Sequence, residues 1–291
     1  MTFRFPANEF GRLTHVVVKH AREAFDSQQA IDDQWHGLNF TAPPRYERAI
    51  EEYDRFLEIV ASTGAEWLPL PRASGVGLDS IYARDASIVT PRGVVLCGMG
   101  KAERIGEPSA QGRAFEARGV PVAGSIDAPG CLEGGDLVWL DAHTVCVGRG
   151  YRTNDDGIRR LRGLLGDTIE LVEVPLPHYR GPGDVFHLMS IISPVDVDLA
   201  VVYSPLMPVP FREWLLARGI ALVEVPDAEF EAMGANVLAL APRHCVMLEG
   251  CPRTRALLER AGAHVEVYAG DEISLKGGGG PTCLTRPLGR V

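Results

Sequence analysis

The sequence predicts one α/β domain, residues 1–291, in which five ββαβ-like units close into a ring. Three observations carry this prediction. Pairs of apolar, strand-like runs joined by short turns recur along the chain, and each pair is followed by a helical stretch and a further strand. The N-terminal copy lacks one strand of its pair, while a spare strand-like run remains near the C-terminus. Pairing these two runs leaves no open sheet edge at the seam.

The elements of the four complete units follow from this pattern in chain order. Their first strands are expected at 86–89, 137–140, 188–193 and 237–240, and their second strands at 94–96, 145–147, 198–203 and 245–248. Polar or amphipathic stretches that end at 118, 165, 218 and 261 predict the helices. The last strands are expected at 119–122, 169–174, 219–225 and 262–267.

The N-terminal unit is completed from both ends of the chain. A strand at 13–19, a strongly amphipathic helix at 45–62 and a strand at 64–68 belong to it. The run 283–287 is its missing first strand. The ring is therefore expected to be closed by the C-terminal strand, with an N-terminal insertion between the first strand and the first long helix.

Closure of the ring gives one residue of each unit an equivalent place near the axis, at or just before its first strand. These residues are Asp85, Glu133, His187, Asn236 and Cys283. A cysteine, a histidine and two carboxylates that converge on one pocket suit nucleophilic chemistry. The spacing alone is equally consistent with unrelated cap and turn residues.

Composition restricts the class of protein. With 46% hydrophobic and 23% charged residues the chain is globular, and it has no apolar run near the roughly 20 residues of a membrane helix. A net charge of −9 argues against nucleic acid and anionic membranes as partners. The first residues lack a hydrophobic signal core, so a cytoplasmic protein is expected. Six cysteines without a CxxC pair favour neither a disulfide scaffold nor a zinc site.

Six strings in order resemble a known group of enzymes. They are Asp79-Ser-Ile-Tyr-Ala-Arg-Asp85, Glu133-Gly-Gly-Asp136, Arg152-Thr-Asn154, His187-Leu188, Cys251-Pro-Arg-Thr-Arg255 and Gly277-Gly-Gly-Gly-Pro-Thr-Cys283. Together they resemble the guanidino-group-modifying superfamily, and most closely dimethylarginine dimethylaminohydrolase. The resemblance implies the pentein fold, a five-bladed α/β propeller, over most of the chain.

The resemblance also implies roles for individual residues. Cys283 would be the nucleophile and His187 the general acid and base, with Glu133 holding and charging that histidine. Of the substrate-binding positions, Asp85 would contact the guanidinium and Asp79 would add a polar contact nearby. Arg104 and Arg152 would bind the α-carboxylate of the substrate. The backbone carbonyl of Leu38 would accept a hydrogen bond from its α-amino group.

The implied reaction is cysteine-dependent hydrolysis of a guanidino compound. A thiolate attacks the resonance-stabilised guanidinium carbon better than water does and makes a covalent S-alkylthiouronium intermediate accessible. The expected substrate is an Nω-methylated arginine, converted to citrulline and an alkylamine. Neither a cofactor nor a metal is implied. The expected partner is a small guanidino amino acid. The sequence leaves open whether the protein forms a homodimer.

Two residues bear on the substrate, and the alternatives remain open. Met189 stands where arginine deiminases carry a second aspartate, and its thioether leaves a place for an alkyl substituent to pack. Arg84 adds a positive charge beside Asp85 and would disfavour a cation if it entered the pocket. An arginine deiminase or dihydrolase, an amidinotransferase, and a non-catalytic binding protein of the same fold are the alternatives. Other histidines, including His244 and His264, show no ligand-like spacing and are assigned nothing.

Overall fold

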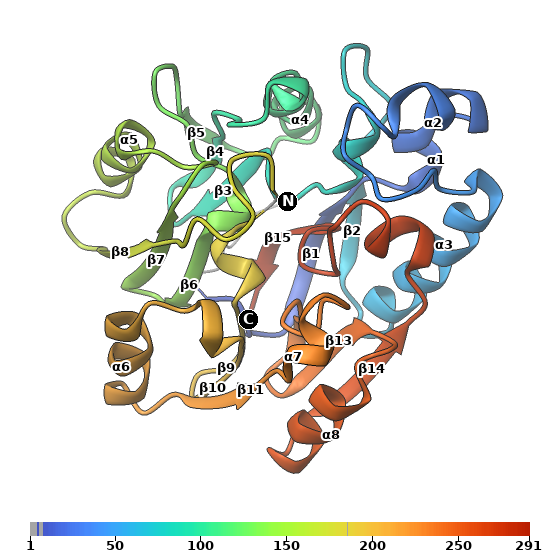
Figure 1. The fold of residues 1–291 in the computed structure, drawn as a ribbon. Helices are drawn as coiled ribbons and strands as arrows, with labels where there is room; N and C mark the ends of the chain where they lie inside the picture. Colours follow the sequence, from blue (N-terminus) through green and yellow to red (C-terminus); the bar gives the residue numbers. More distant parts are fainter. Residues whose placement is uncertain (1–4, 6–7, 185) are drawn as a thin grey trace.

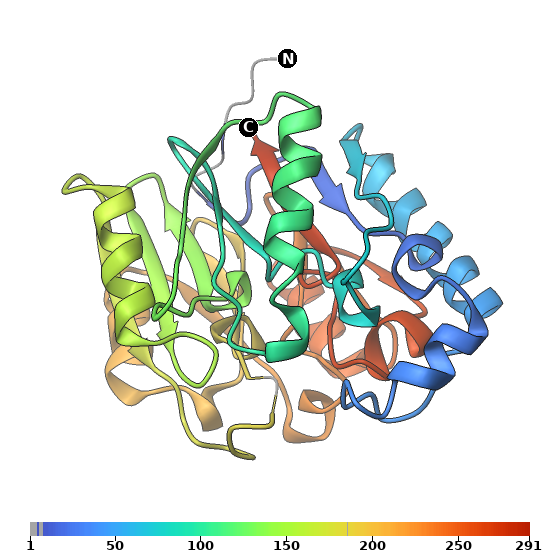
Figure 2. The ribbon, with the colours of Figure 1, turned by 90° about the horizontal axis from the view of Figure 1, so that it is seen from above.

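Five small sheets are arranged in a ring, and the longer helices lie around its outside (Figure 1; Figure 2). The computed structural model describes residues 5, 8–184 and 186–291. In these ranges each of the five sheets has three strands, and its central strand is antiparallel to one neighbour and parallel to the other. Residues 1–4 and 6–7, part of the start on which the cytoplasmic expectation rests, lie outside the described residues.

Four sheets are each built from consecutive strands. Their strands are β3 (Ser87–Thr90), β4 (Gly93–Leu96), β5 (Val122–Ser125), β6 (Leu137–Asp141), β7 (Thr144–Arg149), β8 (Glu170–Pro175), β9 (Ile192–Asp196), β10 (Leu199–Val202), β11 (Ala221–Glu224), β12 (Leu238–Ala241), β13 (His244–Leu248) and β14 (His264–Tyr268). Buried side chains from neighbouring sheets pack together, as Ile88 of β3 does with Val147 of β7 in one apolar cluster.

The two ends of the described chain share the remaining sheet. Strand β1 (Leu13–Val18) is its centre, with β2 (Glu66–Pro69) parallel on one side and β15 (Thr285–Arg290) antiparallel on the other. Val18 pairs with Thr285 at the end of the ladder nearest Cys283. The predicted ring of five units closed by the C-terminal strand is confirmed.

Helices connect the strands on the outside of the ring (Figure 1). The longer ones are α3 (Tyr46–Ser62), α4 (Glu107–Ala117), α5 (Asp155–Leu165), α6 (Val209–Ala217) and α8 (Pro252–Arg260), and the short ones are α1 (Ala21–Phe25), α2 (Gln28–Gln34) and α7 (Asp227–Phe230). Helix α5 shows why such segments begin and end where they do. The side chain of Asn154 accepts from the backbone N–H of Gly157 at its start, and Gly166, with φ of 78°, ends it. No helix among the described residues is long and apolar enough to cross a membrane.

The third unit differs from the sequence prediction in its first strand. A strand was expected at 188–193, but Leu188–Ser190 form a short 3₁₀ turn and β9 begins at Ile192. The turn forms because the hydroxyl of Ser190 accepts from the backbone N–H of His187. Similar turns at Leu78–Ile81 and Gly134–Asp136 lie shortly before the first strands of the two preceding units. Only the turn of the third unit falls inside an apolar run that was predicted as strand.

Candidate active site

The five residues predicted to lie at equivalent places come into two contacting groups near the ring axis. Glu133 Oε2 lies 2.8 Å from His187 Nε2, and His187 Nδ1 lies 3.9 Å from Asp85 Oδ1. Asn236 donates from Nδ2 to Cys283 Sγ at 3.3 Å. His187, Asn236 and Cys283 line one cavity of about 280 Å³. The arrangement brings a thiol, an imidazole and two carboxylates to the same region.

Glycines next to Glu133 make this close approach feasible. A Cβ on Gly135 would lie 2.5 Å from His187 Nδ1 and 2.9 Å from Asp85 Oδ1. A Cβ on Gly134 would lie 2.1 Å from the carbonyl oxygen of Arg84. Any larger residue at either position would push these groups apart. The Gly-Gly pair is therefore required by the packing of the site.

Glu133 is the most highly connected carboxylate of the site and is fully buried. Its Oε1 accepts from the backbone N–H groups of Gly100 and Lys101 at 2.9 and 3.2 Å, and Arg152 donates to both of its oxygens. Burial alone would raise the pKa of Glu133, but the hydrogen bond and charge of His187 and the charge of Arg152 outweigh it and hold the pKa well below its usual range. Glu133 is thus a fixed anion against which the imidazole is oriented.

His187 carries its proton at neutral pH. Its side chain is 4% exposed. Burial alone would lower the pKa of His187, but the charges of Asp85 and Asp136 and the hydrogen bond to Glu133 outweigh it and raise the pKa to about 9. Because Nε2 is bound to Glu133, Nδ1 is the nitrogen left facing Asp85. The ring is suited to give a proton first and to act as a base afterwards.

Cys283 lies two residues before β15 and is half-buried. Burial and the charge of Asp85 raise the pKa of Cys283, while hydrogen bonds from Asn236 and Thr282 lower it by less. The thiol is therefore the resting form at neutral pH. A cation placed beside Asp85 would offset the negative charge that helps to raise the pKa of Cys283. It would therefore favour the thiolate.

We expect alkylation of Cys283 by iodoacetamide to accelerate steadily from pH 7 to pH 10, since only the thiolate reacts and the pKa of Cys283 is raised. At each pH Cys283 should still label ahead of Cys97, Cys146, Cys245 and Cys251, which are buried. Peptide mass spectrometry measures the rates, with the half-buried Cys131 as the internal comparison. A labelling rate at Cys283 that does not change with pH would contradict a resting thiol.

Arg104 lies in a different environment from the one predicted for a residue that binds a substrate carboxylate. It is 3% exposed, and its Nη1 donates to Asp85 Oδ2 at 2.6 Å. Its Nε and Nη2 donate to the two oxygens of Glu107 at 2.9 and 2.8 Å. The guanidinium is thus engaged by protein carboxylates and orients Asp85. The other oxygen of Asp85, Oδ1, is buried and has no hydrogen-bond partner among the described residues.

Leu38 and Asp79 are bridged by Lys101, which the sequence analysis did not single out. Lys101 Nζ donates to the Leu38 carbonyl at 2.8 Å and to Asp79 Oδ2 at 2.6 Å. A lysine ammonium therefore lies where the α-amino group of the substrate was expected. The sequence holds only a weak signal for this role, a lysine directly after Gly100 in the loop whose backbone binds Glu133.

The other singled-out residues divide between the cavity and its surroundings. Met189 is 4% exposed and lines the cavity. Arg152 is 6% exposed and is held by Glu133. Arg84 points to Glu9 and to the carbonyl of Thr282, at 3.2 and 3.0 Å, and is not among the described residues that line the cavity. The charge beside Asp85 is therefore turned away from the site.

The cavity also has a charged entrance that sequence reasoning missed. Arg180, Asp184, Glu231 and Lys276 are among its lining residues, and Arg180 pairs with Glu231 at 2.6 Å. Lys276 pairs with Glu272. Arg180 and Asp184 lie in one segment, and Glu231 and Lys276 lie in two others far from it in the sequence, so only the fold brings these segments together.

The glycines before Cys283 allow the loop to approach an aromatic ring. A Cβ on Gly279 would lie 2.3 Å from Tyr82 Cε1. Gly278 instead has φ of 80°, with open space around the Cβ position. The close packing of Gly279 against Tyr82 and the positive φ of Gly278 together place Cys283 at the cavity.

Asp85, Glu133 and His187 also offer ligand atoms within 4.8 Å of one another, a spacing compatible with a metal ion. Both carboxylates, however, are already paired with arginines, Asp85 with Arg104 and Glu133 with Arg152. The two carboxylates are therefore part of a network of charged side chains, in which Asp85 Oδ1 lies 3.9 Å from His187 Nδ1 and has no hydrogen-bond partner among the described residues.

The sequence is similar to a family model and to several known proteins. The sequence model of the family described as N,N dimethylarginine dimethylhydrolase, eukaryotic, matches residues 22–290. A dimethylarginine dimethylaminohydrolase of Streptomyces coelicolor is 30% identical over 247 residues, 81% of this chain and 84% of the relative. An arginine deiminase of Mycobacterium marinum is 31% identical over 210 residues, 61% of this chain and 49% of the relative.

Solved structures show the same fold. A cysteine-to-serine variant of the Pseudomonas aeruginosa enzyme DDAH, complexed with citrulline, superposes with a TM-score of 0.76 at 21% identity, over 96% of this chain and all of the other. The N-terminal domain of ArgZ, a cyanobacterial arginine dihydrolase, has a TM-score of 0.78 at 20% identity, over 95% and 97%. The amidinotransferase SxtG of Microseira wollei has 0.77 at 16%, over 98% and 97%.

Proposed function

Because the chain belongs to the dimethylarginine dimethylaminohydrolase family of guanidino-modifying pentein enzymes, we propose that it hydrolyses an Nω-methylated arginine to citrulline and an alkylamine. The observation that carries the proposal is Oδ1 of Asp85, a buried oxygen without a hydrogen-bond partner among the described residues. It lies 3.9 Å from His187 Nδ1, beside the cavity that Cys283 lines. A guanidinium N–H bound there would satisfy this oxygen and lie near both the thiol and the imidazole.

The first half of the proposed reaction forms a covalent intermediate. The bound guanidinium offsets the charge of Asp85, which favours release of the Cys283 proton to solvent and formation of the thiolate, since His187 is already protonated. The thiolate attacks the guanidinium carbon, and a C–S bond forms. His187, protonated at neutral pH, gives a proton to the alkyl-substituted nitrogen as its C–N bond breaks. The alkylamine leaves and an S-alkylthiouronium remains.

The second half consumes water. His187 is now neutral and takes a proton from a water molecule that attacks the same carbon. The C–S bond breaks, the ureido product leaves and Cys283 regains its proton. Glu133 orients the imidazole through both steps and favours its protonated form, a role supported by the 2.8 Å contact between Oε2 and Nε2.

A substrate panel tests this proposal directly. Arginine, monomethylarginine, dimethylarginine, agmatine and citrulline are each assayed for ureido product, ammonia and alkylamine. We expect alkylamine and citrulline in equal amounts from dimethylarginine, with the highest kcat/KM. Ammonia from arginine as the preferred reaction would indicate a deiminase or dihydrolase instead. Turnover only with an added amine acceptor would indicate an amidinotransferase.

Met189 is expected to set the preference for a substituted guanidine. We predict that Met189→Asp raises kcat/KM for arginine relative to dimethylarginine by at least about 10-fold, because a second carboxylate pairs an unsubstituted nitrogen and removes the apolar surface beside an alkyl group. Met189→Leu, which keeps that surface, is the matched control and should leave the ratio near its original value. An unchanged ratio in the aspartate variant would remove Met189 from the explanation of specificity.

A further inference from the structure

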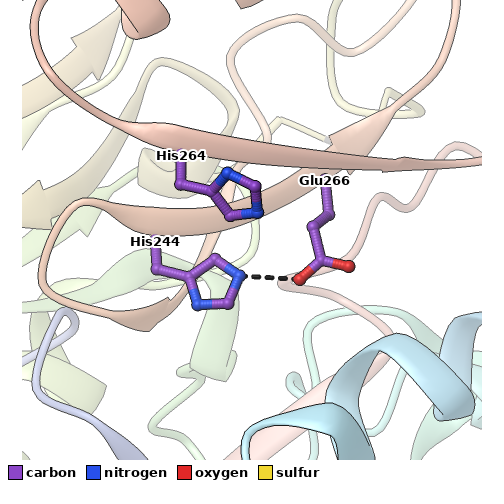
Figure 3. A group of neighbouring side chains, drawn as sticks. All are labelled: His244, His264 and Glu266. Atoms are coloured by element: carbon purple, nitrogen blue, oxygen red, sulfur yellow. Dashed lines mark hydrogen bonds and ion pairs between the residues drawn. The ribbon is translucent and has the colours of Figure 1, made fainter.

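We propose that His244, His264 and Glu266 bind one divalent transition-metal ion, with Zn²⁺ as the representative, on the partly exposed face of the sheet formed by β12, β13 and β14. Figure 3 shows the three side chains side by side on neighbouring strands. Their ligand atoms, one from each residue, all lie within 4.8 Å of one another. Within the described part of the chain this group is distinct from the one at the ring axis, which consists of Asp85, Glu133 and His187.

Strand register places the three side chains on one face. His244 of β13 pairs with His264 of β14 in a parallel ladder, and Glu266 lies two residues further along β14. Side chains at i and i+2 of a strand share a face, and direct cross-strand partners lie next to each other. Cys245 and Val265, at the alternate positions, are buried on the opposite face. The backbone therefore holds the ligand positions before any ion binds.

The contacts already approach those of a chelate. His244 Nε2 lies 2.6 Å from Glu266 Oε1, and the rings of His244 and His264 are 4.8 Å apart at an interplanar angle of 56°. A zinc ion takes imidazole nitrogen and carboxylate oxygen at about 2.0–2.2 Å. Rotation of the side chains is enough to admit the ion between them. It would take the place of the hydrogen bond between His244 and Glu266.

Two imidazoles and one carboxylate define the class of ion. These donors suit Zn²⁺, Ni²⁺ and Cu²⁺ better than Mg²⁺ or Ca²⁺, which prefer oxygen ligands alone. Three protein ligands leave at least one position for water. The site is accessible from solvent, since His264 is exposed and the side chains of His244 and Glu266 are 29% and 27% exposed.

The cation next to His244 in the sequence does not oppose binding strongly. Arg243 precedes His244, but its guanidinium donates to Asp196 at 2.7 Å and to Asp198 at 2.6 Å. Its third contact is the carbonyl of Ala261. Its charge is therefore offset by two carboxylates and turned to a neighbouring unit.

The fold itself does not require these ligands. In the second unit the same register pairs Thr144 with Glu170 and Cys146 with Val172, so its equivalents of His244, His264 and Glu266 are Thr144, Glu170 and Val172. That sheet forms with the same strand order without a group of this kind. The three ligands are thus particular to the sheet of β12–β14.

A titration with Zn²⁺, in which calorimetry measures the heat of binding, tests the proposal. The measurements use the Cys283→Ser variant, so that the thiol of the active site cannot supply a competing ligand. We expect one Zn²⁺ per chain and a rise in Tm with added Zn²⁺. His264→Ala in the same background should weaken binding at least about 100-fold and remove the rise in Tm. Because His264 is exposed, the variant should fold normally without metal.

A matched control and a spectroscopic readout locate the ion. His143→Ala removes an exposed histidine from the corresponding turn of the second unit and should leave Zn²⁺ affinity unchanged. Co²⁺ bound to the chain with Cys283 intact should give visible d–d bands, and His264→Ala should remove them. The spectrum should show no band from thiolate-to-metal charge transfer. Equal Zn²⁺ affinity with and without His264, or metal bound only when Cys283 is present, would overturn the proposal.

Discussion

Cys283→Ala should lower kcat by at least about 10⁴-fold, because the reaction then has no nucleophile that can form the covalent intermediate. The free energy of unfolding should change by no more than ~1 kcal/mol, since the lost side chain is half-buried and its hydrogen bonds, at 3.3 and 3.8 Å, are to sulfur, a weak acceptor. Alkylamine release measures the first quantity, and urea denaturation measures the second.

Cys131→Ala is the matched control, because Cys131 is also half-buried but lies on a different loop. It should retain activity within about 2-fold, because Cys131 is not among the described residues that line the cavity. Substrate binding to Cys283→Ala should also persist, since Oδ1 of Asp85 can still accept a hydrogen bond from the guanidinium. Substantial turnover in Cys283→Ala would refute the covalent mechanism and leave His187-activated water as the attacking group.

Glu133→Gln is expected to lower kcat by about 10²–10⁴-fold, the range associated with loss of a properly charged general acid and base. The substitution keeps the shape but removes the anion that binds both His187 and Arg152. Without that anion the pKa of His187, raised to about 9 in the intact site, falls toward its ordinary value. The alkaline limb of the rate profile should therefore move to lower pH. Rates measured from pH 6 to pH 10 test this shift.

Two comparisons separate a catalytic effect of Glu133 from a structural one. Glu229→Gln removes another buried carboxylate that binds backbone N–H groups, at the start of α8, and should reduce stability without moving the pH profile. In a double-mutant cycle, Glu133→Gln should cost little further activity once His187 is alanine. Additive losses in that cycle would mean that Glu133 acts independently of His187.

The ring could be predicted from the sequence because its evidence is periodic. Alternating apolar runs recur in every unit, and the missing strand of the first unit has a counterpart near Cys283. Closure by β15 then follows from counting strands. The same logic identified Asp85, Glu133 and His187 as equivalent positions, since each directly precedes a turn or strand of its unit. Local hydrogen bonds, such as that from His187 N–H to Ser190, were not visible in the pattern, and the first strand of the third unit was misplaced for that reason.

Side-chain partners could not be predicted in the same way. An arginine near a pocket can contact a substrate or a protein carboxylate. Which of the two it contacts depends on the direction in which its side chain points. Arg104 contacts Asp85 and Glu107, whereas Arg84 turns to Glu9. Lys101 reaches Leu38 and Asp79 from a loop that carries no motif. Contacts of this kind follow from the fold and not from spacing along the chain.

The same limit explains why His244 and His264 went unassigned. They are twenty positions apart, and the segment between them gives no indication of how they would meet. Only the parallel register of β13 and β14 makes them direct neighbours. Metal ligands on adjacent strands therefore need a register before they can be recognised, while ligands within one helical or CxxC motif do not.

Pairing of β1 with β15 makes the reactive thiol dependent on the most distant contact in the chain. Val18 and Thr285 are separated by most of the chain, and contacts between such remote segments form slowly. Cys283 takes its place beside Asn236 next to that ladder. A partly folded chain can thus hold Glu133 and His187 in their own units without assembling a working centre. Enzymatic activity is in this sense a reporter of complete folding.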